Sequence, residues 1–359
     1  MKKSILILII ITSLISCNSR ETFLYVGTYT NGESEGIYKL TFNLETGEIG
    51  EKQLVSKTNN PSFIALSPNK KFMYAVNEIN DYNSEVSGVV EAYSINKNGG
   101  LQFLNKVSSK GAHPCHISVD QKNKKVVVSN YTGGTVVIYN INTNGSLSEV
   151  VQVLNHNLDS VQSHAHYAKF ISNSLFVADL GRNSVFEYEN KQDNFQLKTN
   201  SLVEMTENAG PRHFITDNSG AFLYVINEYA NTITSIKKEG GNYELIQNES
   251  TLSDDFEGIS FCADIHISKK QQFVYGSNRG ENSIVVFKRN LETGTLQKIQ
   301  NISTRGDWPR NFTLSTNGKF LLVANQKSNS ISVFDVNGET GKLCFIEKYE
   351  LDTPVCLVF

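Results

Sequence analysis

Three basic side chains recur at one position of a repeated sequence pattern. Each copy of the pattern contains a short apolar segment that ends in Asp or Ser. Arg212 lies five residues before Asp217, Arg310 lies five residues before Ser315, and His166 occupies the same place in a more divergent copy. Because side chains alternate along a strand, residues of equal register point in the same direction. The three side chains are therefore predicted to converge on a cationic, imidazole-bearing space suited to an anionic or carbonyl-containing small molecule.

A second position, at the end of the next predicted strand of each copy, carries further charge. It reads Asn77-Glu78, Asn227-Glu228 and Asn278-Arg279 in three of the copies. Glu228 belongs to the same copy as Arg212, so we expect these two side chains to face each other. Charged and amide side chains in a wet channel can also serve only to satisfy backbone groups through water, and this alternative stays open.

Several histidines begin other copies of the pattern. His164 and His166 are two residues apart and would share one strand face, as ligands of a metal can. A metal site would also need carboxylates or a third histidine held in a fixed geometry, and the spacing of the sequence offers neither. No CxxC, P-loop or Rossmann fingerprint occurs. We therefore expect no metal and no cofactor.

The elements that must position these residues are short strands in an internal repeat. A strand ending in Asp or Ser is followed by an aromatic and β-branched strand ending near Asn, clearest in residues 309–315 and 320–325. A third, alternating strand and a fourth strand after an Asn-Gly or Thr-Gly turn complete each copy. Four antiparallel strands at a period of about 45–50 residues are typical of a β-propeller blade.

The number of copies predicts how the ring closes. Six copies begin near residues 61, 112, 163, 210, 262 and 308. The remaining segments are residues 22–57, which hold the later strands of a blade, and residues 353–359, which look like a first strand alone. Together they predict a seventh blade built from both chain ends, which leaves no strand edge unpaired. The fold class is thus an all-β, seven-bladed propeller with four-stranded antiparallel blades.

Composition excludes several classes of partner. The 359 residues carry 33 Lys+Arg and 36 Asp+Glu, a net charge of −3, which gives no electrostatic case for nucleic acid or an anionic membrane surface. The sequence is 39% hydrophobic and 19% charged, which is too apolar for a disordered chain. We expect a monomer whose partner is a small molecule.

The N-terminus has the pattern of an export signal. Lys2 and Lys3 precede an apolar stretch over residues 4–14, too short to span a bilayer but typical of a signal peptide. The stretch ends in Leu14-Ile-Ser-Cys17, which resembles a bacterial lipoprotein box; an ordinary signal peptide with a chance cysteine is the alternative. We predict a lipoprotein signal peptide over residues 1–16, lipidation of Cys17, a linker over 17–21 and one propeller domain over 22–359. The protein would be exported and held at a membrane only by its lipid anchor.

Four cysteines remain beyond Cys17: Cys115, Cys262, Cys344 and Cys356. They are far apart in the sequence, and a chain of this length can build its own hydrophobic core. We interpret all four as small buried residues rather than as disulfide partners.

Several strings of the sequence together resemble a known family. They are Phe23-Leu-Tyr-Val-Gly-Thr-Tyr-Thr30, His164-Ala-His166, Gly210-Pro-Arg-His213, Tyr224-Val-Ile-Asn-Glu228, Ala263-Asp-Ile-His266 and Ser277-Asn-Arg279. In this order they are similar to the seven-bladed propeller lactonase family, which includes the propeller-type bacterial 6-phosphogluconolactonase and the fungal 3-carboxymuconate lactonizing enzyme. The resemblance extends from about residue 22 to the C-terminus. One departure is Ser163, where members often carry proline.

The resemblance implies a set of site residues. The active-site His, Arg, Glu and Arg of the fungal enzyme fall on His166, Arg212, Glu228 and Arg279, and two of these were aligned above by register alone. Around them, His164, His213, Arg310 and Asn227 are expected to bind substrate.

The chemistry of these residue types suits lactone hydrolysis in carbohydrate metabolism. Opening a lactone with water builds negative charge on the carbonyl oxygen, which Arg212 and Arg279 could stabilise, while His166 or Glu228 could act as general base. The expected substrate is a sugar lactone such as 6-phosphogluconolactone or, given the export signal, an unphosphorylated aldonolactone. The alternatives are a propeller lipoprotein that binds a ligand or partner without catalysis, and a muconate cycloisomerase.

Overall fold

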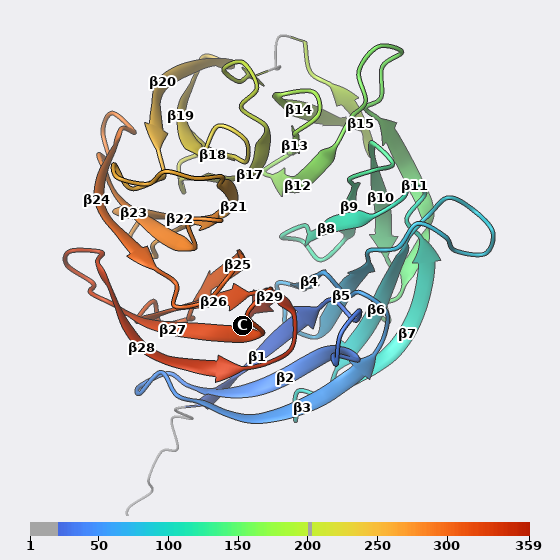
Figure 1. The fold of residues 1–359 in the computed structure, drawn as a ribbon. Helices are drawn as coiled ribbons and strands as arrows, with labels where there is room; N and C mark the ends of the chain where they lie inside the picture. The colour runs from blue at the N-terminus through green and yellow to red at the C-terminus, as the bar shows by residue number, and fades with distance from the viewer. Residues whose placement is uncertain (1–20, 200–202) are drawn as a thin grey trace, which may run out of the picture.

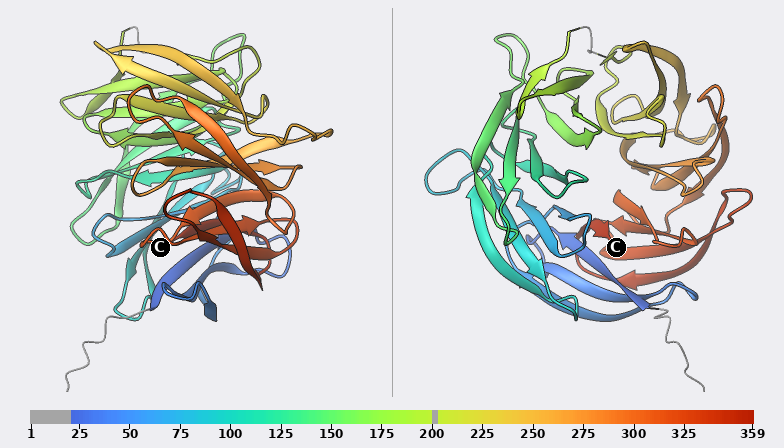
Figure 2. Two further views of the ribbon diagram at one scale, coloured as in Figure 1. Left: turned by 90° about the vertical axis from the view of Figure 1, so that its left-hand side faces the viewer. Right: turned by 180° about the vertical axis from the view of Figure 1, so that it is seen from behind.

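The computed structural model describes residues 21–199 and 203–359, which form 29 strands and no helix. The strands make seven antiparallel sheets arranged in a ring about a central axis (Figure 1). Figure 2 shows the ring from the side and from behind. The predicted seven-bladed propeller is therefore confirmed.

Residues 1–20, with the predicted signal peptide and Cys17, lie outside the described residues. In the described part of the chain, no helix is long and apolar enough to cross a membrane.

Each blade runs from a central strand outward. The blade that joins the chain ends consists of β29 (Pro354–Val358), β1 (Glu21–Thr28), β2 (Gly36–Asn43) and β3 (Ile49–Lys57). The next two consist of β4 (Phe63–Leu66), β5 (Phe72–Asn77), β6 (Val89–Ile95) and β7 (Leu101–Ser108), and of β8 (Pro114–Val119), β9 (Lys125–Asn130), β10 (Thr135–Ile141) and β11 (Leu147–Asn155).

The remaining four blades follow in chain order. They consist of β12 (Ala165–Ile171), β13 (Ser174–Asp179), β14 (Ser184–Lys191) and β15 (Asn194–Leu197), with β16 (Val203–Glu204) also paired to β14; β17 (Pro211–Thr216), β18 (Phe222–Asn227), β19 (Thr232–Glu239) and β20 (Asn242–Ser250); β21 (Phe261–Ile267), β22 (Phe273–Arg279), β23 (Ser283–Arg289) and β24 (Leu296–Ser303); and β25 (Pro309–Leu314), β26 (Phe320–Asn325), β27 (Ser330–Val336) and β28 (Leu343–Glu350).

The position of a strand in its blade explains its sequence pattern. The second strands, such as β18 and β26, are buried along their whole length because a neighbouring blade packs on each face. They therefore read as continuous apolar runs rather than as an alternation. The outermost strands, such as β11 and β28, alternate between more and less exposed residues along their length. The hydrophobic core accordingly lies between blades, in clusters that draw on two neighbouring sheets.

The chain ends close the ring as the sequence predicts. β29 pairs antiparallel with β1, with Val26 opposite Leu357 and Gly27 opposite Cys356. Leu357 packs in a core cluster with Leu24 and Leu322, so the last strand joins the first and last blades. The C-terminus lies beside β1 in the ring (Figure 1).

A repeated hydrogen bond links neighbouring blades. A tyrosine of the second strand donates its hydroxyl to a glycine carbonyl in the turn before the outer strand of the next blade, as Tyr74 does to Gly145 at 3.0 Å and Tyr224 to Gly294 at 2.9 Å. Gly145 has φ +89°, in the region that favours glycine. These turns therefore fix the spacing of the blades as well as reversing the chain.

The four cysteines are all free, but only three are buried. The prediction that Cys344 is buried is wrong. Cys344 lies on β28, an outermost strand, where the residues that alternate with the core-facing Leu343 point to solvent.

Candidate functional site

The residues aligned by the repeat share an irregularity of the central strands. In β17, Pro211 pairs with Asn227 but His213 pairs with Ile226, so Arg212 is an extra residue in the ladder. The same shift occurs at Cys115 in β8, His166 in β12 and Arg310 in β25. A β-bulge of this kind re-aims the side chain it carries. The common register predicted from the sequence is therefore a column of bulges at one mouth of the channel.

A cavity of about 200 Å³ lies at this mouth. It is lined by Tyr29, Glu78, Cys115, Tyr131, His166, Arg212, Glu228, Arg279 and Arg310. These come from the bulges of the central strands and from the residues that end or follow the second strands. A larger hollow of about 330 Å³ lies among lysines and loops around Asp120 and Phe170, and contains none of the predicted site residues.

Glu228 joins two arginines at the cavity. Its Oε2 lies 2.8 Å from Nε of Arg212 and 2.8 Å from Nη2 of Arg279. The Arg212 contact is a charge pair rather than an aligned hydrogen bond, because the Nε–H does not point along it. Burial raises the pKa of the Glu228 carboxyl, but Arg279 and Arg212 more than offset this, so the net pKa is lowered. Burial and the neighbouring Arg279 lower the pKa of Arg212 to about 10, which leaves the Arg212 guanidinium charged at neutral pH.

Arg310 has its own carboxylate on the other side of the cavity. Its Nη2 lies 3.8 Å from Oε2 of Glu78, which also accepts a hydrogen bond from the Tyr29 hydroxyl at 2.9 Å. Burial would lower the pKa of Arg310, but its electrostatic interactions with Tyr29 and Glu78 raise the pKa above its usual range. With three arginines and two glutamates, the cavity keeps one positive charge in excess.

His166 is the group at the cavity that is available to exchange a proton. It is 4% exposed, and within the described chain no protein group hydrogen-bonds either ring nitrogen; Nδ1 is fully buried without a partner. Burial lowers the pKa of His166 well below its usual range, and the nearby charges of Arg212, Arg310 and Arg279 lower it further. The imidazole is therefore neutral at pH 7 and keeps a free lone pair.

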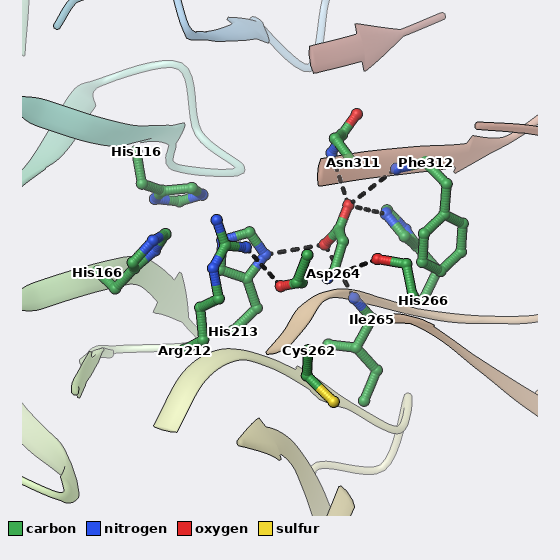
Figure 3. A network of polar contacts seen from close by, with 12 residues as sticks. His116, His166, Arg212, His213, Cys262, Asp264, Ile265, His266, Asn311 and Phe312 are labelled. Atoms are coloured by element: carbon green, nitrogen blue, oxygen red, sulfur yellow. Dashed lines mark hydrogen bonds and ion pairs between the residues drawn. The ribbon is translucent and has the colours of Figure 1, made fainter. Parts of the chain in front are cut away.

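A second polar cluster lies behind Arg212 along the channel (Figure 3). His213 is 2% exposed, and its Nδ1 lies 2.8 Å from Oδ1 of Asp264 while its Nε2 lies 3.3 Å from Nη1 of Arg212. Asp264 also accepts hydrogen bonds from His266 and Asn311. His213 was expected to bind substrate; both of its nitrogens instead contact protein groups.

The other predicted substrate-binding residues fall at different distances from the cavity. Arg310 lines it. His164 stands beside it, stacked on Tyr131 with ring centroids 4.5 Å apart. Asn227 is fully buried and donates its amide to Thr234 at 2.8 Å, so it holds the strands of its own blade and does not line the cavity.

The loop that leads to His164 explains the serine at position 163. The buried Ser163 hydroxyl donates to Oδ2 of Asp179 at 2.5 Å, and Oδ1 of Asp179 accepts the backbone N–H of His164 at 2.9 Å. The Ser163 N–H donates to Asn157 at 3.0 Å, which a proline could not do. The loop before His164 thus depends on a residue at position 163 that keeps its backbone N–H.

Four residues that line the cavity were not predicted from the sequence to belong to the site: Tyr29, Glu78, Tyr131 and Cys115. The sequence did contain a pattern that could have identified all but Cys115: in each blade, the residue after the Asn, Asp or Thr near the end of the second strand. Over the seven blades this position holds Tyr29, Glu78, Tyr131, Leu180, Glu228, Arg279 and Gln326, and five of these line the cavity. Extending that position to all blades would have found both tyrosines.

Comparison with known proteins agrees with the fold. The model of the seven-bladed β-propeller lactonase family matches residues 23–359. The chain belongs to this family. A 6-phosphogluconolactonase of Bacillus subtilis is 34% identical over 83% of this chain and 86% of its own length, and one of Formosa agariphila is 32% identical over 83% and 88%. The solved structure of a periplasmic gluconolactonase of Pseudomonas aeruginosa is similar to this lactonase-family chain with a TM-score of 0.87, at 28% identity over 94% of this chain and 98% of that one.

Proposed function

We propose that this protein hydrolyses the lactone of an aldonic acid in the cavity at the channel mouth. The observation that carries the proposal is a neutral His166 with a free lone pair in the same cavity as Arg212 and Arg279. A proton acceptor beside a pair of guanidinium groups is what the addition of water to an ester carbonyl requires. The excess positive charge of the cavity also suits a reaction that creates an anion.

The steps follow from the properties of each group. His166 takes a proton from water while the water oxygen bonds to the lactone carbonyl carbon, and the carbonyl oxygen becomes an oxyanion beside Arg212 and Arg279. Collapse of this intermediate breaks the bond between the carbonyl carbon and the ring oxygen, and the ring oxygen takes the proton back from His166. Because its low pKa makes the protonated imidazole a strong acid, His166 is well suited to this second transfer. The product is the open hydroxy acid, which ionises.

Glu228 serves the arginines in this scheme rather than the water. Its Oε2 lies 2.8 Å from a nitrogen of each guanidinium group, whereas no protein group of the described chain hydrogen-bonds the ring nitrogens of His166. Its charge keeps Arg212 and Arg279 side by side despite their mutual repulsion. Of the two candidate bases in the sequence, His166 is therefore the one that we assign.

The opposite side of the cavity offers groups that can recognise a sugar. The Tyr29 and Tyr131 hydroxyls, the Glu78 carboxylate and the Arg310 guanidinium can hydrogen-bond to hydroxyl groups, and Arg310 can also pair with a phosphate. Relatives named 6-phosphogluconolactonase and gluconolactonase make both kinds of lactone reasonable substrates. With Cys17 as the lipid anchor of an exported protein, an unphosphorylated aldonolactone is the substrate that we favour.

The test is turnover of a small lactone panel by purified protein. Glucono-δ-lactone and 6-phosphoglucono-δ-lactone are followed by acid release with a pH indicator, against a buffer blank that measures spontaneous opening. We expect hydrolysis well above the blank for at least one lactone and loss of that activity in Arg212→Ala. No turnover above the blank for any lactone, with a folded protein, would overturn the proposal and favour a binding propeller. A preference for the phosphorylated lactone would overturn the choice of substrate alone.

A further inference from the structure

Asp264 is a buried carboxylate surrounded by hydrogen-bond donors. It is 4% exposed and lies on β21, in the blade next to the one that carries Arg212 (Figure 3). Its donors are Nδ1 of His213 at 2.8 Å, Nε2 of His266 at 3.1 Å, Nδ2 of Asn311 at 2.6 Å, and the backbone N–H groups of Ile265 at 2.9 Å and Phe312 at 3.3 Å. Burial raises the pKa of Asp264, but His266 and His213 outweigh it, so the carboxyl stays ionised. An ionised carboxylate can only accept hydrogen bonds.

This carboxylate determines which nitrogen of His213 carries the proton. Nδ1 faces Oδ1 of Asp264 and must therefore be the protonated nitrogen. Burial and the charge of Arg212 lower the pKa of His213 to about 4, so the ring is neutral and Nε2 has a lone pair. Nε2 lies 3.3 Å from Nη1 of Arg212, which can only donate. The chain of donors and acceptors runs in one direction, from Arg212 through His213 to Asp264.

We infer that Asp264 and His213 are positioning residues that aim the Arg212 guanidinium at the reacting carbonyl oxygen. Nη1 of Arg212 is engaged twice, by the carbonyl oxygen of Ala263 and by Nε2 of His213, while Nε pairs with Glu228. Nη2 is the nitrogen of Arg212 that has no protein partner among the described residues. Two of the three guanidinium nitrogens thus contact protein groups, and the N–H groups of Nη2 remain free for substrate. This role rests on the proposed lactone hydrolysis.

The bulge in β17 makes the arrangement possible. In a regular strand, adjacent side chains point to opposite faces, so Arg212 and His213 could not both lie in the channel. The extra residue at position 212 breaks the alternation. The side chain of Arg212 reaches the cavity at the mouth, and His213 lies directly behind it.

Two substitutions of His213 separate its two contacts. The amide of Asn lies near the position of Nδ1, so His213→Asn keeps a donor to Asp264 and loses the acceptor for Arg212. The amide oxygen of Gln reaches the position of Nε2, so His213→Gln keeps the acceptor for Arg212. We expect kcat to fall about 10²-fold in His213→Asn, as for a misplaced catalytic group, and less than about 5-fold in His213→Gln. KM should change less than kcat in both variants.

His116 supplies the matched control. It is buried near His213, with the two ring centroids 5.9 Å apart, and within the described chain it forms no hydrogen bond or ion pair with Arg212. We expect both His116→Asn and His213→Asn to melt at a lower temperature than the wild type, but His116→Asn should keep kcat within about threefold of wild type. Equal loss of kcat in His213→Asn and His213→Gln, or an equal loss in His116→Asn, would show that His213 acts only through packing.

A measurement that does not depend on activity completes the test. The ¹⁵N chemical shifts of His213 in the unsubstituted protein report its tautomer, and we expect a neutral ring protonated at Nδ1 at pH 7. A ring protonated at Nε2, or an imidazolium, would overturn the inference even if the enzyme is active. If the protein opens no lactone but His213 has the expected tautomer, the proposed function fails and the arrangement around Arg212 stands.

Discussion

Replacing Arg212 with alanine tests the electrostatic part of the mechanism most directly. Arg212 is 2% exposed, pairs with Glu228 and donates Nη1 to the carbonyl oxygen of Ala263. Loss of one donor to a developing oxyanion typically lowers kcat about 10²–10³-fold, and we expect a loss in this range. Breaking a buried pair costs about 3–5 kcal/mol. Because Arg279 still lies 2.8 Å from Glu228, the lower end applies, equivalent to a melting temperature ~5–10 °C lower.

Arg289 is the control for this experiment. It is 5% exposed, lies on β23 outside the cavity, pairs with Asp217 at 3.0 Å and donates Nε to the Tyr224 hydroxyl at 2.6 Å. Arg289→Ala should therefore lose at least as much thermal stability as Arg212→Ala while keeping the kcat of the wild type. The assay is acid release from the best lactone of the panel, together with thermal melting. If folded Arg212→Ala turns over within about threefold of wild type, Arg212 does not stabilise the oxyanion.

Two further predictions concern pH and ring closure. In the proposed mechanism the neutral form of His166 is the active one, and its pKa is lowered well below 6.5. The value of kcat/KM should therefore stay constant as the pH falls through 6.5 and decline only at lower pH. A decline of kcat/KM centred at pH 6.5 or above would contradict the assignment of His166 as the base. Deleting residues 353–359 removes β29 and the buried Val355 and Leu357, so the melting temperature should fall by more than about 10 °C. A fall of only a degree or two would mean that β29 contributes little to closure.

The fold could be predicted from the sequence because the same signal is repeated. A single run such as 222–227 fits a buried strand or part of a helix, but several copies at one period fit a propeller and little else. The closing strand could be predicted because residues 22–57 supply only the later strands of a blade and residues 353–359 supply only a first strand. Cys344 was misplaced because a single cysteine gives no information on which face of an outer strand it occupies.

Only part of the site could be predicted from the sequence, and the geometry of the central strands explains which residues could be predicted and which could not. His166, Arg212 and Arg310 could be aligned because the bulge recurs at the same place in each central strand. The role of His213 could not be predicted, since strict alternation would place it on the face opposite Arg212. Its partner Asp264 lies 51 residues away in the next blade, a contact that no spacing within one repeat reveals.

The charged groups on the two sides of the cavity differ in how closely they are paired. In the proposed mechanism, the closely paired side stabilises the oxyanion and the other side binds the rest of the substrate. On one side Glu228 holds two arginines at 2.8 Å, and Arg212 is supported from behind by His213. On the other side Arg310 and Glu78 are 3.8 Å apart, a separation that leaves both groups hydrogen-bonding capacity for a ligand. A developing oxyanion benefits most from donors that need not move, which the first side provides. Substitutions at Arg310 or Glu78 should therefore change which lactone is preferred, while those around Arg212 should slow the opening of every lactone.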